Sequence, residues 1–503
     1  MIRHIIFVRS GDPFRCQRWH LGLFSLYTHD KGQPCSGLAI RLRGLLLWLL
    51  GILVFGYVGV VSALFFLWSR DKSLHIDYGD MLLLPYRWDS INEQRAKASV
   101  ESGLQAMKDG RWAAAEMLIR SGLMRSPSIL AGRAPLAEFY LLTGRWPLGK
   151  SLLSGGLPLH YPGRPYMEEA FSVAQGADDL DLCIGWCRDL LNRFGTSMPP
   201  ADRAWLVFRE CQFLLSEEKF HEVADLAASQ ADQAGSELRQ LQVLALLKAG
   251  DTAKALDRLE VWRRQHPGEE VLITCLQAQA FRRAGRLDEM ARCLDRASSL
   301  APRDPAVALY SVSERFEAGQ RGLAGEALNG LLNRFGVGQN QALVEAAMGS
   351  FADIGYAEGM DRLLDFALDA RLPVKQLLLS KIMYHLTEAE SEQARRLLIM
   401  LNGFWDTEKP RDRTLQDFFK LLLEAATDPG TAAQLRFANF CGEQRLEWDD
   451  FLRAAKVLDK SHQEGTALRV LDVAIERFPS SYHLGALHRK IQGEVEAKTA
   501  KQK

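Results

Sequence analysis

The pattern in this sequence that most resembles a reactive site is a phosphate-binding loop. Residues 144–151 read GRWPLGKS, which fits the pattern GxxxxGKS. In a nucleotide-binding fold, the backbone N–H groups of such a loop wrap the phosphates. Its Lys reaches the β- and γ-phosphates and its Ser holds Mg²⁺. The pattern alone would predict a nucleotide-binding protein.

The surroundings of this segment favour another interpretation. A phosphate-binding loop follows a buried strand, whereas residues 134–143 (APLAEFYLLT) have the spacing of a helix. Pro147 would also stiffen a loop that has to wrap around phosphates. Nucleotide binding through GRWPLGKS is therefore kept as a weaker alternative.

Other residues that could perform chemistry are scattered. The chain has eight cysteines and no CxxC pair, so it lacks the spacing of a zinc ribbon or a thioredoxin-type site. Cys183 and Cys187 would share one helical face, where small core residues are expected. His221-Glu222 lacks the second His of a zinc-protease helix. We predict no catalytic, metal-binding or cofactor-binding residues and no enzyme; a site assembled within 157–200 or 336–441 is a weaker possibility.

Composition indicates a large helical protein. A chain of 503 residues is too long for one compact core, so several domains or a repeat array are expected. Alternating segments rich in Val, Ile and Thr are nearly absent, which predicts an all-α chain. The 62 basic and 62 acidic residues balance, so no general attraction to nucleic acid is expected.

Residues 44–68 form the longest apolar segment. These 25 residues carry no charge, and sixteen of them are Leu, Ile, Val or Phe. At about 1.5 Å per residue they can cross a hydrocarbon core of about 30 Å. Val61-Ser62-Ala63 resembles a signal-peptide cleavage site, but LFFLW follows directly. The segment is predicted to be an uncleaved transmembrane helix that contacts the lipid bilayer from Gly44 to Trp68.

Charge on either side of this helix predicts its orientation. Residues 1–43 carry seven Lys or Arg against two Asp, whereas four Asp and three Lys or Arg occur in residues 69–89 after it. The positive-inside rule then places residues 1–43 in the cytoplasm as a basic, irregular tail, if the start is correctly assigned. We expect a single-pass protein of the cytoplasmic (inner) membrane, with the rest of the chain on the extracytoplasmic side.

Two similar segments lie between Leu238 and Pro305. Each has an apolar helical run, a turn Gly (Gly250 or Gly285), a second apolar run and a terminating Pro (Pro267 or Pro302). Gly to Gly and Pro to Pro are both 35 residues apart. Turn glycines at 110 and 144, and at 285 and 319, are 34 residues apart. The chain therefore repeats a helix–turn–helix unit.

This unit resembles the tetratricopeptide repeat (TPR) superfamily, whose period is 34 residues. The family's small residue in helix A corresponds to Gly103, Ala137, Ala278 and Ala455, and its small residue early in helix B to Ala115, Gly149, Ala255, Ala324 and Ala467. Gly144 and Gly149 of GRWPLGKS thus occupy repeat positions. The resemblance implies a right-handed α-solenoid of antiparallel helical hairpins, in addition to the transmembrane helix.

The domain boundaries follow from these patterns. Residues 69–91, which include Pro85, are predicted to be a linker, residues 92–490 the TPR-like array, and residues 491–503 a polar C-terminal tail. Matches to the repeat are weak in 157–200 and 336–441, where degenerate hairpins are expected to continue the solenoid. About ten to twelve hairpins are predicted.

The resemblance also implies a binding groove lined by helix A of each repeat. On the best repeats these positions are Gln240, Leu244, Lys248, Gln279, Arg282 and Arg283. Lys248, Arg282 and Arg283 would form a basic stretch suited to an acidic or extended peptide segment.

These patterns predict a membrane-anchored scaffold or adaptor that mediates protein–protein interactions in an envelope, secretion or surface-polymer assembly. An accessory regulatory subunit of a membrane enzyme or transporter is the alternative. No cofactor is expected, and the oligomeric state is left open.

Overall fold

The computed structural model describes residues 5–8, 24–28, 36–69, 77–157, 161–230, 235–334, 341–406, 408–428 and 430–502. Parts of the predicted tail 1–43 and linker 69–91 lie outside these residues. The chain divides into unit 1 (Met1–Leu136) and unit 2 (Ala137–Lys503), and each is described by itself.

Unit 1 begins with a small sheet. Strands β1 (Ile5–Val8), β2 (Phe24–Thr28) and β3 (Ser36–Arg41) are arranged in the order β1-β3-β2, with β1 parallel and β2 antiparallel to β3. The prediction that residues 1–43 are irregular is therefore wrong for these segments. IIFV in β1 and FSLYT in β2 contain the aromatic and β-branched residues that favour strands.

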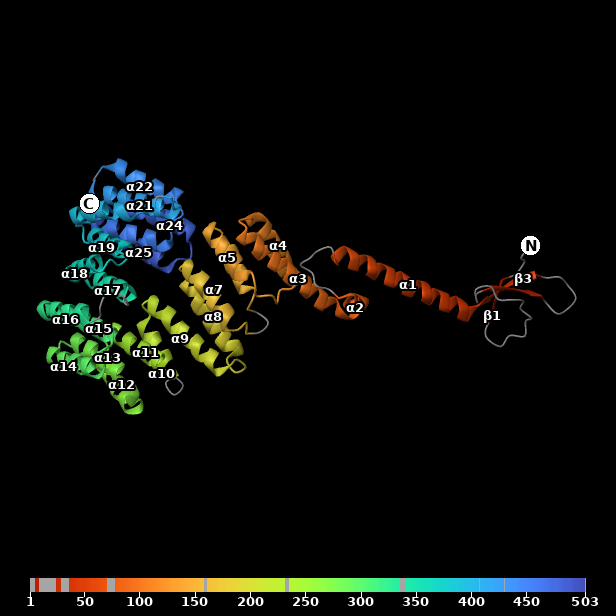
Figure 1. The fold of residues 1–503 in the computed structure, drawn as a ribbon, viewed down its shortest axis with the longest axis horizontal. Coiled ribbons are helices and arrows are strands. Elements are labelled where there is room, and N and C mark those ends of the chain that lie inside the picture. The colour runs from red at the N-terminus through yellow and green to blue at the C-terminus, as the bar shows by residue number, and fades with distance from the viewer. Residues whose placement is uncertain are drawn as a thin grey trace. The chain divides into compact units, whose positions relative to one another are not determined.

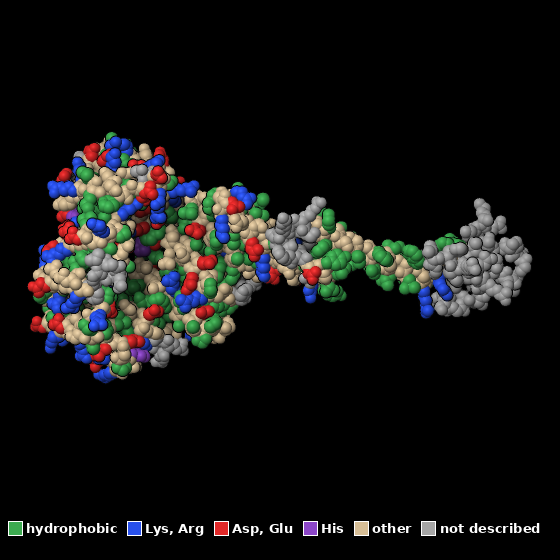
Figure 2. Space-filling view, in the orientation of Figure 1, with side chains coloured by type: hydrophobic (Ala, Val, Ile, Leu, Met, Phe, Trp, Pro, Cys, Tyr) green, Lys and Arg blue, Asp and Glu red, His purple; other side chains and the backbone are tan. Residues whose placement is uncertain are grey.

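Helix α1 (Leu42–Ser69) contains the predicted span of residues 44–68. Among the described residues, one helix is long and apolar enough to cross a membrane, and it is this one, over Leu42–Leu67. Figure 2 shows hydrophobic side chains along its exposed surface.

Helix replaces most of the expected linker. Helices α2 (Tyr78–Leu82) and α3 (Leu84–Lys108) begin inside the range 69–91. Pro85 lies in the first turn of α3, where the missing N–H costs no helical hydrogen bond. It therefore starts a helix instead of breaking one, which is why the sequence pattern was misleading here.

In the described part of the chain, successive helices pair as helical hairpins, from α3 with α4 in unit 1 and from α7 with α8 through to α23 with α24 in unit 2. The predicted count of ten to twelve hairpins stays a prediction. The remaining helix of unit 1 is α4 (Trp112–Arg125). Helix α5 (Arg133–Leu142) contains the unit boundary, and α6 (Trp146–Ser154), α7 (Arg164–Gly176), α8 (Leu180–Phe194), α9 (Pro200–Ser216), α10 (Phe220–Ser229), α11 (Ser236–Lys248), α12 (Thr252–Gln265), α13 (Glu270–Arg283) and α14 (Leu287–Leu300) follow. The later helices are α15 (Pro305–Glu317), α16 (Arg321–Arg334), α17 (Gln341–Ile354), α18 (Ala357–Asp369), α19 (Lys375–Thr387), α20 (Ser391–Leu401), α21 (Pro410–Thr427), α22 (Thr431–Glu443), α23 (Trp448–Lys460), α24 (Glu464–Arg477) and α25 (Tyr482–Gln502). Two 3₁₀ turns are η1 (Pro267–Glu269) and η2 (Asn402–Phe404).

This all-α solenoid confirms the predicted fold class (Figure 1). Within the weakly matching range 336–441, the described residues from 341 onward include the paired helices α17–α18, α19–α20 and α21–α22, as expected. Residues 491–502 continue α25 with Ile491 buried, so the separate tail predicted for 491–503 is instead part of that helix.

Small residues allow the two helices of a hairpin to approach closely. A Cβ atom at Gly103 of α3 would lie 2.6 Å from Ile119 Cγ1 of α4, closer than carbon atoms approach. At Gly122 of α4, a Cβ atom would lie 2.7 Å from the carbonyl oxygen of Ala96. These two glycines, of which Gly103 matches a small position of the repeat, therefore determine the helix spacing in this hairpin.

Several degenerate hairpins lack a turn glycine. Asp178, Glu218, Ala389 and His462 have positive φ, between 53° and 59°, at turns where other hairpins have Gly. Only glycine adopts this left-handed conformation without steric cost. Tertiary packing therefore maintains these turns, and the sequence signal based on glycine could not find them.

The C-terminal helix of unit 2 returns to an early hairpin of the same unit. Figure 1 shows the blue C-terminal helices lying next to the yellow α7–α8 hairpin. Asp178, in the α7–α8 turn, accepts hydrogen bonds from Ser481 Oγ at 2.7 Å and from the backbone N–H of His483 at 2.9 Å. Its backbone carbonyl accepts the N–H of Tyr482 at 3.1 Å. The solenoid of unit 2 is thus closed on itself.

Two more contacts support this closure. The Tyr482 hydroxyl donates to the carbonyl oxygen of Glu217 in the α9–α10 turn at 2.9 Å. His483 Nδ1 lies 2.8 Å from Asp178 Oδ1, and the His483 ring stacks on Trp448. The first turn of α25 therefore contacts two turns that are more than 260 residues earlier in the chain.

We expect this closure to weaken as pH rises. The hydrogen bond to Asp178 raises the pKa of His483 above its usual value of 6.5. When folding raises the pKa of a group, its protonated form stabilises the folded state. This stabilisation is complete below the pKa of the unfolded chain and is lost as pH rises through the pKa of the folded chain. His483→Gln should therefore lower the melting temperature more at about pH 6 than at about pH 9.

Thermal unfolding of the full chain in detergent micelles at both pH values checks this. His462→Gln, at an exposed histidine in the α23–α24 turn, is the control and should show no such difference. An equal effect of His483→Gln at both pH values would contradict the expectation.

Candidate interaction surface

The structure places the predicted groove residues on two neighbouring helices. Gln240, Leu244 and Lys248 lie on α11, and Gln279, Arg282 and Arg283 lie on α13, which contacts α11. Lys248 and Arg283 are exposed, and the other four are partly buried. The six residues therefore lie on two contacting helices, and their role in lining a groove stays a prediction.

The charge of Arg282 is already compensated within the chain. Arg282 Nε donates to Glu314 Oε2 at 2.6 Å, and Arg282 Nη2 lies 2.9 Å from Glu317 Oε2; both glutamates are on α15. Glu314 is buried. Burial raises the pKa of the Glu314 carboxyl, although the hydrogen bond from Arg282 acts in the opposite direction. Binding an acidic peptide at Arg282 would therefore leave a buried carboxylate without its cation.

The other two cations also have contacts within the chain. Arg283 Nη1 donates to the carbonyl oxygen of Leu247 at 2.6 Å, near the C-terminus of α11. Lys248 Nζ lies 5.7 Å from the centre of the Phe220 ring. The proposed basic stretch therefore depends on Lys248 and Arg283, and it stays a prediction.

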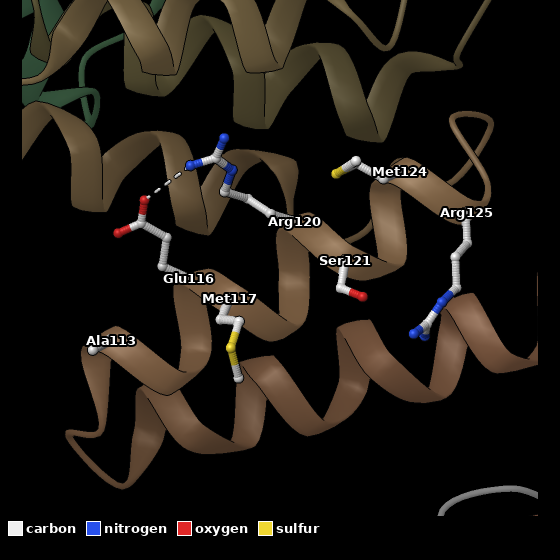
Figure 3. Close-up of a pocket in the computed structure, with 7 residues that line it drawn as sticks. All are labelled: Ala113, Glu116, Met117, Arg120, Ser121, Met124 and Arg125. Carbon is white, nitrogen blue, oxygen red and sulfur yellow. Dashed lines mark ion pairs between the residues drawn. The ribbon is translucent and has the colours of Figure 1, made fainter.

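A second surface was not found from the sequence. It is a shallow cleft of about 720 Å³ on α4 in unit 1. Figure 3 shows the seven lining residues, which are Ala113, Glu116, Met117, Arg120, Ser121, Met124 and Arg125. We call this set the α4 methionine surface.

The α4 methionine surface is apolar with a charged border. Met117 is 66% exposed and Met124 is 81% exposed. Glu116 and Arg120 pair with each other at 3.5 Å, as the dashed line in Figure 3 marks. Flexible, polarisable methionine side chains adapt to different apolar partners.

The opposite face of α4 fixes the orientation of this surface. Ala115, Ile119, Gly122 and Leu123 are buried. Gly122 packs closely against Ala96 and Val100 of α3, so this face of α4 is held against α3. The seven-residue spacing of Met117 and Met124 was a usable signal for an apolar face, but the family resemblance directed attention to helix A.

In the structure, the GRWPLGKS segment forms part of the turn between two helices and the first residues of the second helix. It is preceded by helix α5, and Gly149, Lys150 and Ser151 lie within helix α6. The buried Asp179 accepts from Lys150 Nζ at 3.2 Å and from Trp146 Nε1 at 3.0 Å. The weaker alternative of a phosphate-binding loop is therefore wrong, because its Lys is oriented to a structural carboxylate and the element directly before it is a helix.

Five of the six cysteines that the structure describes are buried. Cys183 and Cys187 are buried as predicted, and burial raises the pKa of both thiols. Burial also raises the pKa of the Cys211 and Cys441 thiols to about 12. Within the ranges that the structure describes, no group of three or more His, Cys, Asp or Glu side chains could hold a metal ion.

Comparisons with known proteins find helical repeats at low similarity. No family model and no curated protein matches this chain. Among solved structures, it is similar to the APC/C hetero-tetramer Cut9–Hcn1, with 12% identity over 82% of this chain and 96% of that one, and a TM-score of 0.26. The pentatricopeptide repeat protein PPR10 from maize has 14% identity over 88% of this chain and 72% of that one, with a TM-score of 0.31.

A further similar structure is a signal-transduction ATPase with a tetratricopeptide repeat sensor from Pyrococcus horikoshii. It has 12% identity over 86% of this chain and 72% of that one, with a TM-score of 0.28. At such low similarity, no function of these proteins is transferred to this chain. Its description as a helical-repeat solenoid rests on its own helical hairpins.

Arg282 and its neighbour Arg283 should differ in their effect on stability. Arg282→Met leaves the buried Glu314 without its main partner, so we expect the free energy of unfolding to fall by about 3 kcal/mol. Arg283→Met removes one hydrogen bond from an exposed side chain and should cost about 1 kcal/mol or less.

Urea unfolding of the full chain in detergent micelles measures both values. Adding Glu314→Gln to Arg282→Met should recover part of the loss, because no buried charge then remains at position 314. If the two single variants lose the same free energy of unfolding, the ion pair between Arg282 and Glu314 does not stabilise the fold.

Proposed function

We propose that this chain is a membrane-anchored, non-enzymatic scaffold that binds other proteins. The observation that carries the proposal is the α4 methionine surface, which presents two highly exposed apolar side chains on a helix fixed by close packing. Large exposed apolar groups on a rigid support are typical of protein interaction sites.

The chemistry of this surface selects a class of partner. Met117 and Met124 offer adaptable apolar contacts, while Glu116, Arg120 and Arg125 provide both signs of charge at its border. An amphipathic helix of another protein, with an apolar stripe and mixed flanking charges, would satisfy both features. The shallow cleft favours such a helix over a small molecule, which needs deep enclosure.

Anchoring by α1 supports the scaffold function. A single membrane span would confine the repeat array to a thin layer beside the membrane, which raises its effective concentration for other membrane-bound proteins. The charge difference across the span supports an orientation with the N-terminus in the cytoplasm and the array outside it. An envelope, secretion or surface-polymer assembly would provide such partners.

Partner binding at the α4 methionine surface can be tested by photo-crosslinking in native membranes. With p-benzoylphenylalanine at position 117 of the full chain, we expect a discrete adduct whose partner is identified by mass spectrometry. Met124→Glu should lower its yield by about tenfold, because a carboxylate would have to be desolvated in an apolar contact.

Leu323 of α16 is the control, since it is also exposed. The crosslinker at position 323 should not give the same adduct, and Leu323→Glu should leave the yield from position 117 unchanged. Absence of an adduct at 117, or the same adduct from both positions, would contradict the proposal.

The orientation has a separate test. Alkaline phosphatase fused after Lys503 should be active, since this enzyme folds only outside the cytoplasm, where its disulfides form. A cytoplasmic reporter fused at the same position should be inactive. The reverse pattern would place the array in the cytoplasm.

A further inference from the structure

A short segment after the membrane helix is held against that helix. Val61 of α1, Met81 of α2 and Ile91 of α3 form one buried cluster. The Tyr57 hydroxyl donates to the carbonyl oxygen of Leu82 at 2.8 Å, and Ser62 Oγ lies 2.8 Å from the Tyr78 hydroxyl. Helix α2 and the first turns of α3 are therefore fixed beside the C-terminal part of α1.

Helix α1 is longer than a membrane requires. Its 28 residues extend about 42 Å, whereas the hydrocarbon core is about 30 Å thick. Arg41 and Arg43 mark one boundary of that core. About twenty residues from Gly44 then bring the chain to the other boundary near Ala63. The α1 residues that contact α2 are found between Tyr57 and Phe65, on both sides of this boundary.

Four large apolar side chains next to these contacts are exposed. They are Leu82, Leu83, Tyr86 and Trp88, and we call them the collar. Tyr86 is 91% exposed and Trp88 is 46% exposed, whereas Met81 and Ile91 from the same segment are buried against α1. The segment thus uses one set of apolar residues to bind α1 and presents another set outward.

The residue types of the collar suit the boundary between lipid and water. Tyr and Trp concentrate there, since the ring is apolar and the O–H or N–H group reaches water. Leu82 and Leu83 precede them by only a few residues. The collar therefore has side chains suited to lipid acyl chains next to side chains suited to lipid headgroups.

We propose that the collar lies in the membrane interface on the side of the repeat array and binds the lipid surface. This deepens the proposed function and depends on its membrane anchor. The collar would fix the first hairpin, α3–α4, relative to the bilayer, so that the α4 methionine surface is presented in a defined orientation and not on a flexible tether.

The test compares two tryptophans of unit 1. Trp88 and Trp112 have similar exposure, 46% and 49%. They are separated by most of the length of α3, about 30 Å from Trp88 to Lys108. In each of two variants, one of them is replaced by the environment-sensitive fluorescent amino acid Anap. The full chain is then placed in phosphatidylcholine–phosphatidylglycerol nanodiscs with or without lipids spin-labelled near the headgroup.

The collar predicts a blue-shifted emission and about twofold quenching by the spin-labelled lipids at position 88, with neither effect at position 112. Far-ultraviolet circular dichroism should show unchanged helix content in both variants. Extraction of native membranes at alkaline pH, performed in parallel, tests the anchor itself.

The outcomes separate the two proposals. Resistance to alkaline extraction together with unquenched, water-like emission at position 88 would overturn the collar and leave the anchor standing. A blue shift at position 88 without lipid quenching would also overturn it, since the side chain would then be covered by protein. Release of the chain at alkaline pH would overturn both.

Discussion

Unit 2 is closed by the buried carboxylate of Asp178. This residue lies in the α7–α8 turn and accepts hydrogen bonds from the first turn of α25. The first N–H groups of a helix have no partners within it and carry a partial positive charge. Asp178 satisfies one of them at His483 and also binds the Ser481 hydroxyl, which itself accepts the N–H of Leu484. A distant turn thus caps the first turn of the last helix.

Between its ends, the array depends on repeated close packing. One hairpin cannot bury its apolar face alone, so each relies on the next. Glycines such as Gly103 and Gly122 set the distance between paired helices, and large apolar residues fill the space around them. Turns such as Asp178 and Ala389 tolerate positive φ without glycine because the surrounding packing holds them.

This packing also decides which side chains remain available for binding. The cations predicted to line a groove are largely engaged within the array, as Arg282 is with Glu314 and Glu317. Met117 and Met124, in contrast, lie on the outer face of α4 with their surfaces exposed. Function in such a fold is therefore better inferred from side chains that packing leaves exposed than from repeat positions alone.

The sequence by itself determined the local features of this protein. Helical periodicity, turn glycines and prolines predicted the hairpins, and the uncharged segment 44–68 predicted α1, because each depends on residues close together in the chain. Two sequence patterns were misleading. Pro85, which suggested a linker, lies in the first turn of α3, and Lys150, which suggested a phosphate-binding loop, pairs with Asp179. Only the tertiary structure decided that Asp178 meets His483, that Glu314 neutralises Arg282, and that Leu82 lies against Tyr57. The physical reason is that local preferences set the shape of each hairpin, while the small rotation from one hairpin to the next accumulates over the array and determines which distant residues meet.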